Sequence, residues 1–302
     1  MKSAPRFAAD GGRKALCGSP QSEYDKKPFS PMKNQDRGML LVDCQSQQDH
    51  RRIRIDRVGV KGLRHPIEVR DRSFATQSTV ATVSLLVDLP HHFKGTHMSR
   101  FVEVLNAHGR LIHVRNLFSI VHALQKRLDA EVAHLIMEFP YFLEKKAPAT
   151  GAEGLVDYQV RFEAAACGAE TDFVMTAIIP VTTLCPCSKA ISDRGAHNQR
   201  GYVTASIRSG EPIWIEELIE IVESSASSPV YSLLKRPDEK FVTEHAYDHP
   251  VFVEDLVRNV AVRLNSHCDV LWYRVEAENM ESIHNHAAYA LVEKHSGDNG
   301  GG

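Results

Sequence analysis

The run TVATVSLLV, residues Thr79–Val87, alternates apolar with smaller or polar side chains in the two-residue period of a β-strand. An earlier run, Arg52–Val60, alternates in the same way. Apolar residues at helical spacing follow between Phe101 and Leu128, and two more strand-like runs cover Glu131–Leu143 and Leu155–Ala166. This succession predicts a ββααββ unit.

The second half of the chain repeats the succession. We expect strands, then two helices, then strands again, over Asp172–Leu184, Gly201–Arg208, Ile213–Ser224, Phe252–Leu264, Val270–Glu278 and Ser282–Glu293. Two tandem ββααββ units predict an α+β fold with antiparallel sheets and helices on one face. A sheet of this kind has exposed edges, which favours closure into a barrel by oligomerisation.

The ends of the chain differ in composition from its middle. Residues 1–40 are rich in Gly, Pro, Ser, Lys and Asp without a hydrophobic period, and we predict a disordered extension there. We expect a first module over 41–169, a second module carrying the reactive residues over 170–295, and a flexible tail over 296–302.

Composition excludes several classes of protein. The formal net charge of −2 gives no electrostatic footprint for nucleic acid or an anionic membrane. No apolar run reaches the ~18 residues that a membrane-spanning helix needs. Six cysteines in 302 residues lack the density of a disulfide scaffold, so the reducing cytoplasm is the expected location.

Reactive side chains gather after the predicted strand that ends at Leu184. The sequence LCPCSK, Leu184–Lys189, is followed by GAHNQR, Gly195–Arg200, with a polar loop between them that can bring Cys185 and His197 together. Thiolate and imidazole are preferred zinc ligands, and a thiolate is also a strong nucleophile. The alternatives are a buried, inert cysteine and an exposed loop histidine.

Further candidates lie towards the C-terminus. His284 and His286 are two residues apart, so on a strand they would share one face and could bind a metal. Glu239, in an expected loop, could supply a carboxylate or be an ordinary surface charge. Glu254, in the first turn of a helix after Pro250, either interacts with the helix dipole or accepts N–H groups of a planar heterocycle.

In the first half, the segment Phe93–Phe101 places hydrogen-bond donors ahead of a helix. Lysine, serine, threonine and arginine at a helix N-terminus suit a phosphate group. Simple capping of the helix by Thr96 or Ser99 is the alternative.

These motifs resemble those of GTP cyclohydrolase I of type IB. The resemblance covers roughly residues 40 to 295, and its motifs are DLP at 88–90, KGTHMSRF at 94–101, CPCSK at 185–189, GAHNQRG at 195–201 and SIHNH at 282–286. It implies a tunnelling fold and a homotetramer with active sites at subunit interfaces. The implied reaction is hydrolysis of GTP to 7,8-dihydroneopterin triphosphate and formate, the first step of tetrahydrofolate biosynthesis.

The resemblance also implies roles for individual residues. One divalent ion, zinc, manganese or iron, would be held by Cys185, His197, Glu239 and His284. Glu254 would anchor the purine and, with Cys185 and His197, form the catalytic set. Secondary candidates for triphosphate contact or proton transfer are Lys189, His97, Ser99, Arg100, His286 and Cys187.

Two other functions compete with this interpretation. A nicotinamide-dependent nitrile reductase of the same fold would use a cysteine and a purine-anchoring glutamate without a metal, so it has no need of His197, Glu239 and His284. A structural zinc protein would need a closed four-ligand site. The absence of a second cysteine pair facing Cys185 and Cys187 disfavours that alternative.

Overall fold

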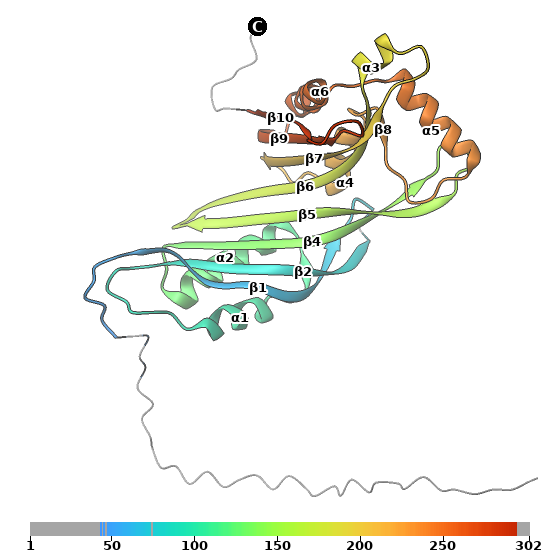
Figure 1. The fold of residues 1–302 in the computed structure, drawn as a ribbon. Coiled ribbons are helices and arrows are strands. Elements are labelled where there is room, and N and C mark those ends of the chain that lie inside the picture. Colours follow the sequence, from blue (N-terminus) through green and yellow to red (C-terminus); the bar gives the residue numbers. More distant parts are fainter. Residues whose placement is uncertain (1–42, 44, 46, 74, 295–302) are drawn as a thin grey trace, which may run out of the picture. The chain divides into compact units, whose positions relative to one another are not determined.

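A computed structural model describes residues 43, 45, 47–73 and 75–294 (Figure 1). These residues belong to one compact unit. The predicted extension over 1–40 and the predicted tail over 296–302 lie outside them.

The described strands form one continuous ten-stranded sheet. Its order is β10-β9-β7-β6-β5-β4-β2-β1-β3, with β8 pairing separately with β6. The strands are β1 (Ile55–Arg70), β2 (Thr76–Leu89), β3 (Leu111–Ile112), β4 (Val132–Lys146), β5 (Glu153–Cys167), β6 (Glu170–Leu184), β7 (Asn198–Ser209), β8 (Ser228–Pro229), β9 (Val270–Met280) and β10 (Ala288–Glu293).

The two halves of the chain meet at β5 and β6. These strands pair antiparallel from Gln159 opposite Ile178 to Cys167 opposite Glu170. The predicted module boundary, between residues 169 and 170, falls at the end of the turn that joins them. The sheets expected for the two halves are therefore parts of one sheet.

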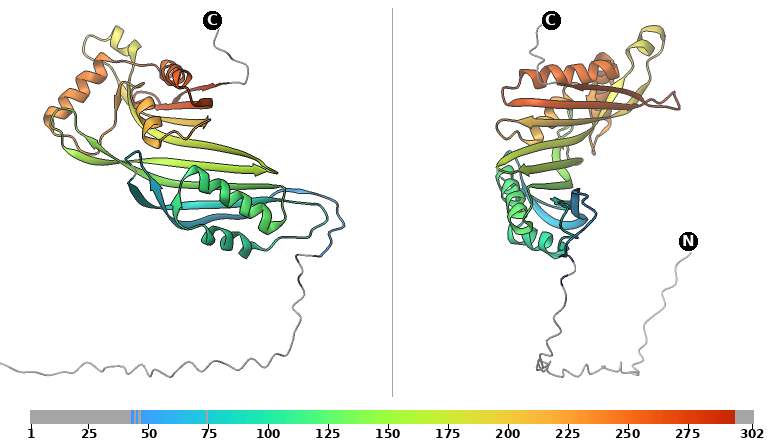
Figure 2. Two further views of the ribbon diagram at one scale, coloured as in Figure 1. Left: turned by 180° about the vertical axis from the view of Figure 1, so that it is seen from behind. Right: turned by 90° about the vertical axis from the view of Figure 1, so that its left-hand side faces the viewer.

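Four helices cover one face of this sheet (Figure 2). They are α1 (Met98–Ala107), α2 (Val114–Leu128), α4 (Ile215–Glu223) and α6 (Val253–Ser266). The alternation that predicted β2 buries Val83, Leu85 and Val87 under these helices, each at most 1% exposed. The predicted α+β fold, antiparallel with helices on one face, is confirmed. No helix of the described part is long and apolar enough to cross a membrane.

Three local expectations were wrong. The first strand continues to Arg70, ten residues beyond the predicted end, because an irregularity between Val60 and Leu63, with Gly62 at φ 74°, lets the pairing with β2 resume. Glu239 lies in a helix, α5 (Arg236–Asp248), and not in a loop. That helix is mostly exposed, so it has no apolar period that sequence reasoning could detect.

The third error concerns His284 and His286. We expected a strand over 282–293, but β9 ends at Met280 and β10 begins only at Ala288. The two histidines lie in the turn between them. Alternation of apolar and polar residues does not show where a strand begins when a short polar turn precedes it.

Candidate active site

Cys185 stands where a strand changes into a helix. β6 ends at Leu184, and Cys185 is the N-cap of the short helix α3 (Pro186–Ile191), whose first position is the proline. The backbone N–H of Cys185 donates to the carbonyl of His197 (3.1 Å), and the N–H of His197 donates to the Ser188 hydroxyl (2.9 Å). The loop therefore folds back as predicted and holds Cys185 beside His197.

The side chain of His197 contacts Gln199, which is held in turn by Thr183. Its Nδ1 lies 3.0 Å from Gln199 Oε1, and Gln199 Nε2 donates to the Thr183 hydroxyl at 2.9 Å. Because Gln199 presents its oxygen to the ring, Nδ1 is the nitrogen that carries the proton. The lone pair of Nε2 is then available, which is how a neighbour outside the ligand set prepares a metal-binding histidine.

Cys185 and Glu254 line the same cavity, of about 180 Å³. The N–H of Val251 donates to the carbonyl of Leu184 (3.1 Å), which places the start of α6, and with it Glu254, at the end of β6. Asn279 of β9 also lines this cavity and is 2% exposed. Its Oδ1 accepts no hydrogen bond from the described residues.

The turn that carries the two histidines adjoins this cavity. Glu281 lines it, and His284 Nε2 lies 3.6 Å from the carboxylate of Glu281. The rings of His284 and His286 stack at 5.1 Å, and a donor atom from each of these three residues lies within 4.8 Å of the others. Ligand atoms around a tetrahedral zinc ion are roughly 3–4 Å apart, so small side-chain rotations would suffice.

Glu239 lies on α5. It is exposed and lies in the first turn, on the same helix face as Thr243 and Ala246. Those two residues line a second cavity of about 460 Å³, together with Asn198 and Ser282 from the segments that carry His197 and His284. Glu239 thus shares a face of α5 with two residues of this cavity but does not line it, and the carboxylate beside His284 is that of Glu281.

The remaining predicted contacts are not gathered at the cavity within one chain. Lys189 donates to the Tyr247 carbonyl and stacks on the Tyr247 ring at 4.2 Å, so it ties α3 to α5. Ser99 and Arg100 lie in the first turn of α1, and His97, its N-cap, contacts Asp43 at 3.1 Å.

The alternative interpretation of the segment Phe93–Phe101, capping of α1 by Thr96 or Ser99, is wrong, since His97 is the N-cap. This helix packs near β1, and β2, β4 and β5 separate β1 from β6 in the sheet.

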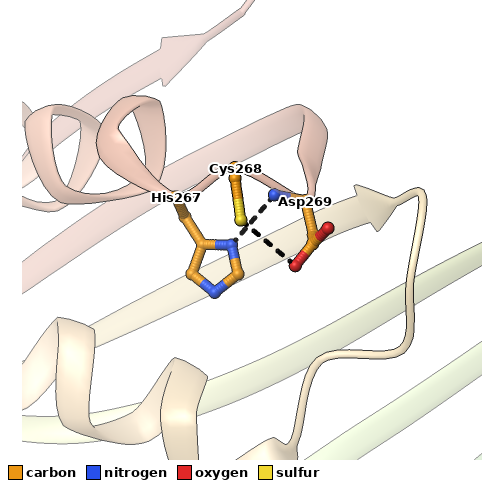
Figure 3. A group of neighbouring side chains, drawn as sticks. All are labelled: His267, Cys268 and Asp269. Carbon is orange, nitrogen blue, oxygen red and sulfur yellow. Dashed lines mark hydrogen bonds between the residues drawn. The ribbon is translucent and has the colours of Figure 1, made fainter.

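A second group with metal-ligand chemistry, His267, Cys268 and Asp269, lies in the turn before β9 (Figure 3). The Nδ1 of His267 accepts from the Asp269 N–H (3.2 Å), and its Nε2 lies 2.9 Å from Glu217. A hydrogen bond to Asp269 raises the pKa of the Cys268 thiol. Both imidazole nitrogens are engaged and the thiol favours its proton, so this group is a hydrogen-bonded turn.

Sequence reasoning missed Gln199, Asn279 and Glu281. Gln199 belongs to the GAHNQRG motif and lies two residues after His197, a separation that could have indicated it. Asn279 is related to a glycine in the sequence, Gly201. A Cβ atom on residue 201 would lie 2.5 Å from Asn279 Oδ1, so the close approach of Asn279 requires a glycine at that position. That contact joins two strands and is invisible in a linear sequence.

A thiol and two carboxylates line the cavity at the end of β6, and the adjoining segments carry imidazole groups. Such an arrangement is typical of an enzyme active site. The family model for type I GTP cyclohydrolase folE2 matches residues 41–290. This chain belongs to that family.

A GTP cyclohydrolase FolE2 from Akkermansia muciniphila is 62% identical over 257 residues, which cover 84% of this chain and 97% of the relative. One from Methylococcus capsulatus is 56% identical over 260 residues, covering 86% and 97%.

Among solved structures, uricase from Arthrobacter globiformis matches with a TM-score of 0.47 and 9% identity, covering 79% of this chain and 92% of that one. The relatives described here are named cyclohydrolases, and nothing supports the nitrile reductase alternative.

Proposed function

We propose that this chain hydrolyses GTP to 7,8-dihydroneopterin triphosphate and formate, the first step of tetrahydrofolate biosynthesis, and that it does so in the cytoplasm. Membership of the type I GTP cyclohydrolase family supports GTP as the substrate. The observation that supports the site assignment most directly is the cavity shared by Cys185 and Glu254, a thiol and a carboxylate from separate elements.

The donor set suits one divalent metal ion, zinc, manganese or iron, bound by Cys185, His197, Glu239 and His284. Thiolate, imidazole and carboxylate are ligands that such ions accept together. Gln199 accepts from Nδ1 of His197 and so leaves the Nε2 lone pair of that ring available for the ion. Glu281 lies beside His284. Both neighbours would orient the ligands without binding the ion themselves. When bound, the ion would lower the pKa of a water molecule towards neutrality.

The chain's own residues would bind the base and move protons. Glu254 lies in the first turn of α6 and would accept the N–H edge of guanine. His286 Nδ1 lies 3.3 Å from Asn285 Oδ1, so its Nε2 carries the lone pair: it would first take a proton from the attacking water and then, as imidazolium, return it to the ring nitrogen released when C8 is hydrolysed.

The cavity of Cys185 is by itself too small for the whole nucleotide. Its volume of about 180 Å³ is below the ~300–1,000 Å³ of ordinary ligand pockets. The donors of the α1 segment, His97, Ser99 and Arg100, lie across the sheet from it. We therefore propose a homotetramer in which a second copy brings these residues, with Lys189, towards the triphosphate, holding the intermediates in place between steps.

The test is turnover of GTP by the metal-reconstituted protein, measured as formate release and as pterin fluorescence after oxidation. Cys185→Ala is expected to abolish turnover and to lower bound metal. Cys268→Ala is the matched control, because that thiol lies in the hydrogen-bonded turn and is expected to leave both unchanged. Absence of product from the wild-type protein with zinc, manganese and iron would refute the proposal.

A further inference from the structure

The end of the first strand and the start of the last helix are arranged alike in both halves of the chain. In the first half, Ile112 pairs with Val69 near the end of β1, and α2 begins two residues later. In the second half, the N–H of Val251 donates to the carbonyl of Leu184 at the end of β6, and α6 begins two residues later. Each half thus joins a strand end to a helix N-terminus in the same way.

This correspondence aligns individual residues. Arg70 follows Val69 as Cys185 follows Leu184, and Arg115 is the second residue of α2 as Glu254 is the second residue of α6. Where the candidate active site has a thiol and a carboxylate, the first half has two guanidinium groups. The side chains at this position are therefore positively charged in the first half, whereas the second half has a thiol and an acidic group.

A larger cavity lies at this position of the first half. Its volume is about 450 Å³, within the range of ligand pockets, and its lining includes Arg70 and Arg115. The apolar part is made by Phe162, Phe173 and Met175, with Phe162 and Met175 7% and 3% exposed. Trp214, the N-cap of α4, adds an aromatic wall from the second half.

The positive charge of the two arginines at this cavity is not neutralised by an ion pair with another described residue of the chain. Arg70 and Arg115 are exposed, and neither makes an ion pair with another described residue. Burial lowers the pKa of His113, and both arginines lower it further, so all three groups are close together. The Nδ1 of His113 accepts the Asn116 N–H (3.3 Å), so this histidine serves as a neutral helix cap and adds no negative charge.

We propose that this cavity binds a small aromatic monoanion, with its ring against Phe162, Phe173, Met175 and Trp214 and its anionic group between Arg70 and Arg115. Aromatic and thioether side chains favour a planar ring. Guanidinium groups favour a carboxylate or a similar oxyanion. The site is distinct from the cavity of Cys185 and does not depend on the function proposed for it.

The test uses 8-anilinonaphthalene-1-sulfonate, an aromatic monoanion whose fluorescence rises on binding, with the full-length protein. The double variant Arg70→Gln/Arg115→Gln is expected to weaken its binding by about tenfold or more. A control double variant, Arg127→Gln/Arg258→Gln, removes equal charge from exposed helix surfaces and should leave the affinity unchanged. Saturating GTP and Cys185→Ala should also leave it unchanged.

The uncharged analogue N-phenyl-1-naphthylamine separates loss of charge from loss of folding. Its binding should be the same in the wild-type protein and in Arg70→Gln/Arg115→Gln, because the apolar lining is intact. Equal affinity of the anionic probe in both double variants would overturn the proposal. So would displacement of that probe by GTP, or an equal loss of both probes in Arg70→Gln/Arg115→Gln.

Discussion

The hydrogen bond to Gln199 determines which ring nitrogen of His197 has a free lone pair. An imidazole has two nitrogens, and a metal ion or a substrate can use only the one that lacks a proton. Gln199 is itself fixed, because it donates to the buried Thr183 hydroxyl. The reactivity proposed for His197 therefore depends on a side chain that touches no reactant.

Replacing Gln199 tests this dependence. Gln199→Leu is expected to weaken metal binding by about 10- to 100-fold, because the acceptor for Nδ1 is lost and both ring tautomers become accessible. Gln199→Glu keeps an acceptor and is expected to retain most of the affinity. Competition against a chromogenic chelator measures both without reference to turnover. Wild-type affinity in Gln199→Leu would show that the imidazole is oriented by something else.

Asn279 presents a buried acceptor without a partner among the described residues. Such a group costs free energy in the protein alone, so Asn279→Leu is expected to be neutral or slightly stabilising. If Oδ1 accepts a hydrogen bond from GTP, the same substitution should raise KM by about tenfold. Thermal melting and steady-state kinetics measure the two effects. A lower melting temperature with unchanged KM would assign Asn279 a purely structural role.

At the scale of elements, α5 is fastened to the β4–β5 hairpin through Asp238. The carboxylate of Asp238 accepts the backbone N–H groups of Ala149, Thr150 and Lys235 and the hydroxyl of Thr150, at 2.7–2.9 Å. Burial opposes its ionisation, but these bonds outweigh burial and lower the pKa of Asp238 from 3.8 to about 2. Glu239 is the next residue, so this anchor positions a proposed metal ligand.

Asp238→Asn tests the anchor. The amide cannot accept all four bonds, so we expect a lower melting temperature at neutral pH and metal affinity weakened by about tenfold. The depressed pKa stabilises the folded state above pH 3.8, and that stabilisation disappears as the pH falls towards 2.

The difference in urea midpoint between wild type and Asp238→Asn should therefore be constant from pH 7 to about 5 and shrink below about 4. A difference independent of pH down to 3 would contradict this account. Asp255→Asn, in the first turn of exposed α6 surface, is the control for removing one carboxylate near a helix start.

At the scale of the whole molecule, the proposed substrate contacts lie at distant strands of the sheet. The cavity of Cys185 lies at the end of β6, and Arg100 lies in α1 near β1. In the sheet of one chain, β5, β4 and β2 lie between β6 and β1 and keep these residues apart. This separation supports the proposed completion of the site by a second chain.

Subunit mixing tests that arrangement. Cys185→Ala and Arg100→Ala should each be nearly inactive alone, because each removes one side of every site. After equal amounts are unfolded and refolded together, about one quarter of the sites would combine an intact contribution from each chain. Recovery of roughly that share of wild-type turnover is expected. No recovery, with mixed oligomers demonstrated by mass, would place both residues in the site of one chain.

Several features were predictable from the sequence. The two-residue period of Thr79–Val87 fixed a strand, and its repetition after a helical segment predicted the α+β fold with helices on one face. The closeness of Cys185 and His197 followed from the polar loop between them. Periodicity reports which residues are buried, and burial of one face is what strands and packed helices require.

Other features could not be predicted from the sequence. The α5 helix buries little, so its sequence has no period, and the turn of His284 and His286 resembles the strand that follows it. The metal and substrate roles of the site residues remain predictions. Such roles depend on where side chains from several elements meet, and a linear pattern does not record distances between elements.

The sequence by itself determined the class of fold, its internal duplication and the family to which the chain belongs, because burial periods and local motifs are properties of neighbouring residues. Only the tertiary structure decided that the two halves share one sheet, that Gln199 sets the proton of His197, and that the position of Cys185 and Glu254 recurs in the first half as Arg70 and Arg115. These depend on strand register and on helix placement, which long-range hydrogen bonds and packing fix.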